Sequence, residues 1–171
     1  MVLKPRESYR LDEQGGFLVV IALEASYCPI CQAMLLMRTT RKRVCWEGET
    51  EADKVILLIR RLYCEECERI HHELPDCLVP YKRYSAEVIE NIVSGQVTKE
   101  IPCPESTARR LRRWWEAVKP YFLGILLTLV ARFGVSFGEP PTFKEIVRAV
   151  ANSNNWVFAH QVCTRSESRP G

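Results

Sequence analysis

The sequence predicts an α+β protein, in which a β-rich, cysteine-bearing ribbon precedes a mostly α-helical C-terminal half. Two Cys-x-x-Cys pairs, Cys28/Cys31 and Cys64/Cys67, each come after an apolar segment of strand-forming residues. Beyond residue 80, apolar residues recur at helical spacing between prolines and glycines. Of the 171 residues, 47% are apolar and 26% are charged, which is typical of a folded soluble protein.

The N-terminal half is predicted to consist of strands and loops. Residues 16–23 (GFLVVIAL) are β-branched and apolar, which predicts a strand that leads to the first cysteine pair. Residues 54–63 (KVILLIRRLY) predict a second strand that ends at the second pair. The basic run 38–43 and the acidic residues that follow it are predicted to form the tip of an extended hairpin between the pairs. Residues 70–75 (IHHELP) predict a loop.

Helices are predicted after the segment 80–84, which we interpret as a linker. Ser85 is a favourable N-cap for a helix over residues 86–94. A second helix is predicted from about residue 105 to 118, where Pro120 ends it. A third, apolar nearly all round, is predicted over about residues 121–133.

A final helix follows Gly138-Glu139-Pro140-Pro141. Thr142 and Glu145 have the spacing of a capping box, and the apolar residues behind them fall on one stripe. We therefore divide the chain into a ribbon (1–79), a helix-turn-helix-like segment (80–119) and a C-terminal helical segment (120–171).

The two cysteine pairs predict a structural metal site. A zinc ion takes four thiolates in a tetrahedron, and each Cys-x-x-Cys turn presents two sulfurs. The 32 residues between the pairs can form the hairpin that brings the turns together. We therefore expect Zn²⁺ to be bound by Cys28, Cys31, Cys64 and Cys67. Four protein ligands leave no open position, so we expect no catalysis at this site.

Other interpretations of the cysteines remain open. The thiols could be unrelated, or one pair could be redox-active, although neither pair opens a helix as a redox motif does. His71, His72 or Cys77, which lie just beyond the second pair, could replace a ligand. The other cysteines are expected to be small buried apolar side chains: Cys45, Cys103 and Cys163.

A basic helix predicts contact with double-stranded DNA. Residues 105–119 carry a net charge of +3, which equals that of the whole chain. Arginine side chains fit phosphate oxygens and the O6/N7 edge of guanine, and helix N-terminal residues can contact phosphates. The candidate DNA-binding residues are Ser106, Thr107, Arg109, Arg110, Arg112, Arg113, Lys82 and Arg83. The alternatives are a solvated arginine-rich helix and one that pairs with the acidic run near Glu49.

The order of these motifs is familiar: a ribbon, then RRLYCEEC at residues 60–67, PYKRYS at 80–85 and STARRLRRW at 106–114. Over about residues 27–115 the chain resembles the N-terminal zinc-ribbon plus helix-turn-helix region of bacterial insertion-sequence transposases, and related small bacterial proteins. The resemblance implies that the four cysteines hold zinc and that the arginines lie on a DNA-reading helix. Two features depart from the family: residues 96–104 leave room for only about one helical turn, and no acidic-triad catalytic domain follows.

We therefore expect a cytoplasmic, zinc-stabilised DNA-binding protein without enzymatic activity, either an accessory or truncated mobile-element product or a regulator. The alternative is a protein-interaction module that docks onto a transposase or another transposition or transcription partner. A homodimer through residues 121–133 is a further expectation. The N-terminus has no apolar signal-peptide region, and the apolar stretch 121–131 is shorter than the roughly 20 residues that a membrane span needs, so we expect no membrane association.

Overall fold

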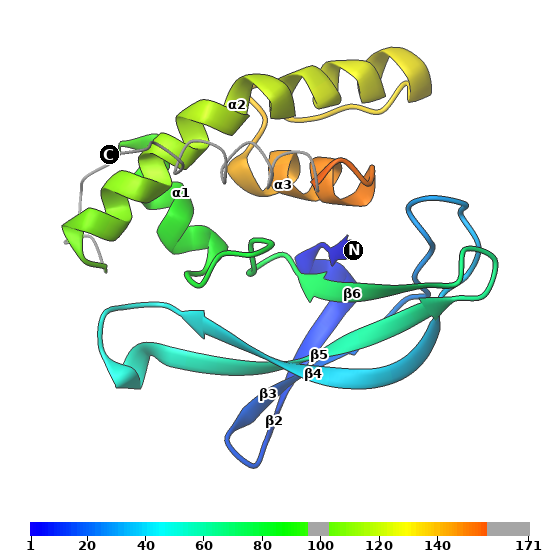
Figure 1. The fold of residues 1–171 in the computed structure, drawn as a ribbon, viewed down its shortest axis with the longest axis horizontal. Helices are drawn as coiled ribbons and strands as arrows, with labels where there is room; N and C mark the ends of the chain where they lie inside the picture. The colour runs from blue at the N-terminus through cyan, green and yellow to red at the C-terminus, as the bar shows by residue number, and fades with distance from the viewer. Residues whose placement is uncertain (96–102, 157–171) are drawn as a thin grey trace, which may run out of the picture.

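The computed structural model describes residues 1–95 and 103–156, and these form a curled β-sheet with α-helices packed on one side of it (Figure 1). The predicted α+β class is confirmed. The strands are β1 (Val2–Lys4), β2 (Tyr9–Gln14), β3 (Phe17–Ala22), β4 (Leu36–Trp46), β5 (Lys54–Cys64) and β6 (Arg69–Pro75). The helices are α1 (Ala86–Ser94), α2 (Glu105–Phe133) and α3 (Phe143–Asn152), with one-turn 3₁₀ helices at Arg6–Ser8 and Glu51–Asp53.

Strand β5 is the centre of the six-stranded sheet, whose order is β1-β6-β5-β3-β2, with β4 also paired to β5. β4 and β5 form a long antiparallel hairpin, in which Leu36 lies opposite Tyr63 and Trp46 opposite Lys54. On its other edge β5 pairs with β6 near its end and with β3, in parallel, near its middle. The hairpin thus joins the region of the cysteines at one end to the helical layer at the other (Figure 1).

The strands predicted at 16–23 and 54–63 are confirmed by β3 and β5, whereas the loop predicted at 70–75 is wrong. These residues form β6, which pairs with β5 and, in parallel, with β1. The basic run does not lie at the hairpin tip but within β4, and the turn consists of residues 47–53, which carry the acidic residues. Strand β6 carries polar side chains whose partners lie on other strands, so the residues of β6 alone do not indicate a strand.

Two predicted helix starts are confirmed. The Ser85 hydroxyl accepts a hydrogen bond from the Val88 N–H at 3.2 Å, and α1 stops at Gly95 with φ 70°, a conformation that suits glycine. Thr142 and Glu145 form the predicted reciprocal capping box at the start of α3. The single helical turn for which residues 96–104 leave room falls on residues 96–102, outside the described residues.

Helix α2 continues through Pro120, so the predicted break between two helices is wrong, and the predicted boundary between residues 119 and 120 falls inside it. The proline removes one intrahelical hydrogen bond. Val118 and Phe122 on either side of it are 1% and 0% exposed, and their packing favours a continuous helix. Within the described residues, none of the helices combines the length and apolar character that crossing a membrane requires.

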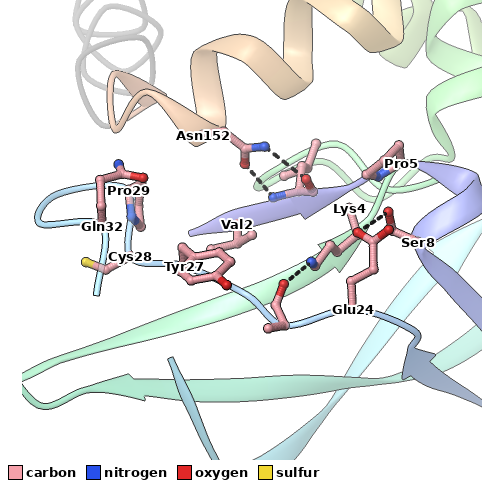
Figure 2. Close-up of a pocket in the computed structure, with 12 residues that line it drawn as sticks. Val2, Lys4, Pro5, Ser8, Glu24, Tyr27, Cys28, Pro29, Gln32 and Asn152 are labelled. Atoms are coloured by element: carbon pink, nitrogen blue, oxygen red, sulfur yellow. Dashed lines mark hydrogen bonds between the residues drawn. The ribbon is translucent and has the colours of Figure 1, made fainter. Parts of the chain in front are cut away.

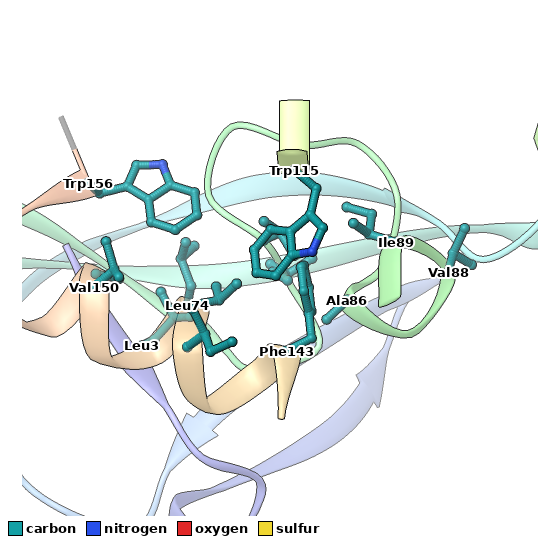
Figure 3. Close-up of a cluster of buried hydrophobic side chains, with 14 of the residues drawn as sticks. Leu3, Leu74, Ala86, Val88, Ile89, Trp115, Phe143, Val150 and Trp156 are labelled. Atoms are coloured by element: carbon teal, nitrogen blue, oxygen red, sulfur yellow. The ribbon is translucent and has the colours of Figure 1, made fainter. Parts of the chain in front are cut away.

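One hydrophobic core joins the sheet to all three helices (Figure 3). Leu3 and Leu74 from the sheet pack under Val150 of α3, and the Trp115 ring of α2 lies edge-on to Phe143 at a centroid distance of 5.0 Å. This core includes residues from each of the three predicted segments. A smaller cluster lies beneath the cysteine pairs and consists of Val2, Cys28, Leu35, Leu62 and Cys64.

Candidate metal centre

The two Cys-x-x-Cys turns have the same local design. In the first turn the Cys28 N–H donates to the Ala33 carbonyl at 2.8 Å, and the Gln32 N–H donates to the Cys28 carbonyl at 2.9 Å. The second turn connects β5 to β6. In each turn the residue immediately after the second cysteine is a non-glycine residue with positive φ, Gln32 at 64° and Glu68 at 53°. This left-handed residue reverses the chain after each cysteine pair.

The hairpin brings the four predicted ligands together. The sulfurs of Cys28, Cys31, Cys64 and Cys67 all lie within 4.8 Å of one another. Two of the separations are 3.5 Å, from Cys31 to Cys64, and 3.9 Å, from Cys28 to Cys67. A tetrahedron with metal–sulfur bonds of about 2.3 Å has sulfur–sulfur edges of about 3.8 Å. A disulfide would need about 2.05 Å, so this spacing fits a shared ion rather than a covalent bond.

The ease with which the cysteine thiols ionise also favours a bound cation. Burial opposes ionisation of Cys28, but backbone N–H groups of Cys31 and Ile30 that point to its sulfur lower its pKa to about 7. Hydrogen bonding to Cys31, together with burial, raises the pKa of Cys67 to about 12. The Cys28 thiolate therefore forms readily, whereas ionisation of Cys67 is disfavoured. A divalent ion supplies the positive charge that lets all four sulfurs ionise.

The cluster is closed on its inner side. Cys28 and Cys64 are both 0% exposed and pack against Leu35 and Leu62, whereas Cys31 is exposed. Four sulfurs from two turns complete a tetrahedron, so the group could hold a metal ion without a vacant position for a substrate. The arrangement suits a structural role.

His71 touches the cluster but does not complete it. Its Nε2 atom lies 3.5 Å from the Cys28 sulfur, and its Nδ1 lies 3.3 Å from the N-terminal amine of Met1. Burial and that amine lower the pKa of His71, which favours the neutral ring. His72 lies opposite Arg61 on the neighbouring strand, and Cys77 packs against the main core. Among the described residues, the close group that suits a metal consists of the four cysteines.

A buried ion pair supports the first turn from behind. Glu73 of β6 is 1% exposed and accepts hydrogen bonds from Arg60 Nε at 2.6 Å and Arg60 Nη2 at 2.9 Å. The Ser26 hydroxyl also donates to Glu73, and the Ser26 carbonyl accepts from the Leu35 N–H at 2.8 Å. Ser26, which precedes the first turn, is thus tied both to β6 and to Leu35 beyond the turn. Sequence reasoning missed Glu73 because residues 70–75 were interpreted as a loop.

The chain that enters this turn also lines a cavity beside β1 (Figure 2). Lys4 lines this cavity, and its ammonium group donates a hydrogen bond to the Ala25 carbonyl at 2.8 Å. At the opposite edge of β1, the Asn152 side chain of α3 accepts from the Leu3 N–H at 2.7 Å and donates to the Leu3 carbonyl at 3.0 Å. These contacts hold β1 between the helical layer and the first cysteine turn.

The predicted DNA-binding residues lie on and beside the first half of α2. Arg109, Arg110 and Arg113 are exposed, and none of them forms an ion pair with the residues that the structure describes. Arg112 instead donates to the Ile92 carbonyl of α1 at 3.3 Å and lies 3.5 Å from Glu105. Arg112 therefore helps to attach α1 to α2.

The remaining candidates lie around the start of α2 and in the segment before α1. Ser106 is exposed and Thr107 half-buried in the first turn of α2. Arg83 is exposed, and the Lys82 ammonium lies 4.0 Å from the centre of the Trp114 ring. This cation–π contact places the 82–83 segment directly beside the arginine-bearing part of α2.

A comparison with protein-family models matches residues 28–114 to a domain of unknown function, DUF6431. The matched region begins at the first metal-ligand candidate, includes the other three and ends within the basic part of α2. No curated protein and no solved structure matches this chain.

Proposed function

The chain belongs to the DUF6431 family, whose model covers half of its length, and we propose that it is a zinc-stabilised DNA-binding protein. The observation that carries the proposal is the exposure of Arg109, Arg110 and Arg113 on one helix, without ion-pair partners among the described residues. Three exposed guanidinium groups between residues 109 and 113 of one helix favour a polyanionic ligand.

Zinc is the metal that best fits the ligands. Four cysteine sulfurs at tetrahedral separations are the donor set of structural zinc sites. Zinc bound there would join the two turns and stabilise this end of the hairpin, because only a small apolar cluster lies beneath the cysteine pairs. The ligand set is complete, so we propose no catalytic role. A reducing cytoplasm would keep these thiols available for the metal.

We propose that the first half of α2 enters the major groove. There Arg109, Arg110 and Arg113 would contact base edges and phosphates, while Ser106 and Thr107 would contact the backbone at the helix start. Helix α1, attached to α2 through Arg112, would serve as the supporting helix of a helix-turn-helix-like pair. A protein of this kind would act as a regulator or as an accessory or truncated product of a mobile element.

The test is binding to a fluorescent DNA duplex over a range of salt concentrations. The variant Arg109→Ala/Arg113→Ala should weaken binding at least tenfold and reduce the salt slope by about two. The matched control is Lys119→Ala/Arg132→Ala, which removes two exposed charges from the same helix. Equal binding by the two double variants would overturn the assignment of α2 as the DNA-contacting helix.

A protein-interaction module is the second candidate, and a specific surface favours it. The C-terminal half of α2 exposes Leu127, Val130 and Phe133, and the first and last of these are 71% and 70% exposed. Such a surface suits a transposase, another transposition or transcription partner, or a second copy of the chain. Partner binding that survives high salt and is lost in Leu127→Ser would favour this function over DNA binding.

A further inference from the structure

A second basic surface lies on the sheet. The strand register places Thr39 of β4, Arg61 of β5 and His72 of β6 in one row across three strands. Side chains two residues apart on a strand share a face, so Arg41 and Arg43 lie on the same face as Arg61. Three arginines from two neighbouring strands are thus gathered on one face of the sheet.

This row reaches the DNA-binding candidates through the segment before α1. The Arg43 guanidinium donates to the Lys82 carbonyl, and the Trp46 N–H donates to the Arg83 carbonyl at 2.8 Å. Lys82 in turn lies over the ring of Trp114 in α2. The end of β4, the 82–83 segment and the basic part of α2 are therefore in direct contact.

The charges along this path influence one another. Burial lowers the pKa of Arg43, and the neighbouring charges of Arg41 and Arg83 lower it further. Burial and the nearby Cys103 and Glu49 raise the pKa of Tyr84, and the charges of Arg110 and Arg83 oppose that rise. Arg83 thus lies within electrostatic reach of Arg43 on the sheet, and both Arg83 and Arg110 of α2 act on Tyr84.

Three of these positive charges lack a direct ion-pair partner among the described residues, and the nearby acidic groups, Glu47 and Glu49, belong to the hairpin turn and act on Cys45 and Tyr84 beside them. Arg41, Arg61 and Arg83 form no ion pair with the described residues. The Nε atom of Arg61 is buried and has no hydrogen-bond partner among them. A buried donor and several adjacent like charges are unfavourable unless an anion lies beside them.

We propose that a basic track, made of Arg61, Arg41, Arg43, Arg83 and Arg110, binds the phosphate backbone of the same DNA duplex whose groove α2 enters. The inference rests on the proposed function and extends the DNA interface from the helix onto the sheet. The part of β4 from residue 41 to 46 spans about 17 Å, which is about half of one helical turn of DNA. The track fixes where the duplex lies on the protein, and α2 reads it.

The test compares two charge-matched double variants by DNA binding and salt slope. Arg41→Gln/Arg61→Gln removes two charges from the track. Arg10→Gln/Lys42→Gln removes two from elsewhere on the sheet, since Lys42 alternates with Arg41 on β4 and its ammonium lies 4.2 Å from the Phe17 ring. The track variant should bind five- to tenfold more weakly, with a salt slope lower by about two, while the control stays within twofold of wild type.

Three outcomes separate the two proposals. Equal binding by both sheet variants, with binding lost in Arg109→Ala/Arg113→Ala, overturns the track and leaves the proposed function standing. No duplex binding by the wild-type protein overturns both. If Arg61→Gln impairs folding, as a thermal melt and the zinc content would report, Arg41→Glu alone, at an exposed position, tests the track. Wild-type affinity in Arg41→Glu would also overturn the track.

Discussion

Replacing Glu73 by glutamine should destabilise the protein far more than replacing Glu51 by glutamine. Both carboxylates form ion pairs, but in different surroundings. Glu73 has a 1% exposed side chain and accepts two hydrogen bonds from Arg60, whose side chain is 22% exposed. Glu51 pairs with Lys54 at 3.0 Å, and its side chain is 77% exposed. The pair of variants thus compares the same chemical change in buried and in solvated surroundings.

The magnitude follows from the contacts. Glutamine keeps one acceptor oxygen, so Glu73→Gln loses one charge-assisted hydrogen bond worth about 1.5–3 kcal/mol. Its amide NH₂ also faces an arginine donor, and the guanidinium loses its counter-charge. Together these effects should cost about 2–4 kcal/mol, close to the range for breaking a buried pair. Glu51→Gln should cost at most about 1 kcal/mol.

Urea unfolding of the zinc-loaded protein, followed by the fluorescence of its tryptophans, measures both losses. In a thermal melt of a chain of this size, Glu73→Gln should lower the melting temperature by roughly 5–15 °C. Equal losses in free energy of unfolding for the two variants would refute the idea that this ion pair supports the first cysteine turn. Replacing both partners, as in Arg60→Leu/Glu73→Leu, should cost less than Glu73→Gln alone.

Three further predictions concern the helices and one cysteine. Leu126→Ala should lower the free energy of unfolding by about 2–5 kcal/mol because Leu126 is 4% exposed, whereas Leu127→Ala should leave it within about 0.5 kcal/mol of wild type. Sedimentation of Leu127→Ala also tests the homodimer expected through residues 121–133. Burial raises the pKa of Cys45 to about 12, so mass spectrometry after iodoacetamide treatment at pH 8 should find it unlabelled until the chain unfolds, and labelling as fast as a free thiol would contradict this. Hydrogen bonds from Thr142 lower the pKa of Glu145 below its unfolded value. Glu145→Ala should therefore lower the free energy of unfolding by about 1 kcal/mol at pH 7. Thermal melts over a pH series should show this difference from wild type shrinking as the pH falls below about 4.5.

The metal-ligand candidates could be predicted from the sequence because their signal is local. Each pair sets two sulfurs in one turn, and the strand over residues 54–63 predicted how the second pair is held. The start of α1 at Ser85 and that of α3 at Thr142 were equally readable, since a cap depends on residues three positions apart. Whether the arginines of α2 contact DNA stays a prediction.

Other elements could not be predicted because their stability comes from distant partners. Residues 70–75 carry two histidines, a glutamate and a proline, yet β5 and β1 pair with them and Arg60 neutralises the buried Glu73. Likewise, Pro120 indicates a helix end, but the contacts of Val118 and Phe122 with the core outweigh one lost hydrogen bond. In both cases tertiary packing overrides the local propensity.

The most direct test of the account is X-ray absorption spectroscopy of the purified protein with its metal. The account predicts one zinc per chain with four sulfur neighbours at about 2.3 Å and no nitrogen or oxygen neighbour. Cys67→Ser should then lower the number of sulfur neighbours to three. A histidine nitrogen among the atoms bound to the metal, or a protein that folds fully without any metal, would contradict the four-cysteine site that joins the two ends of the hairpin.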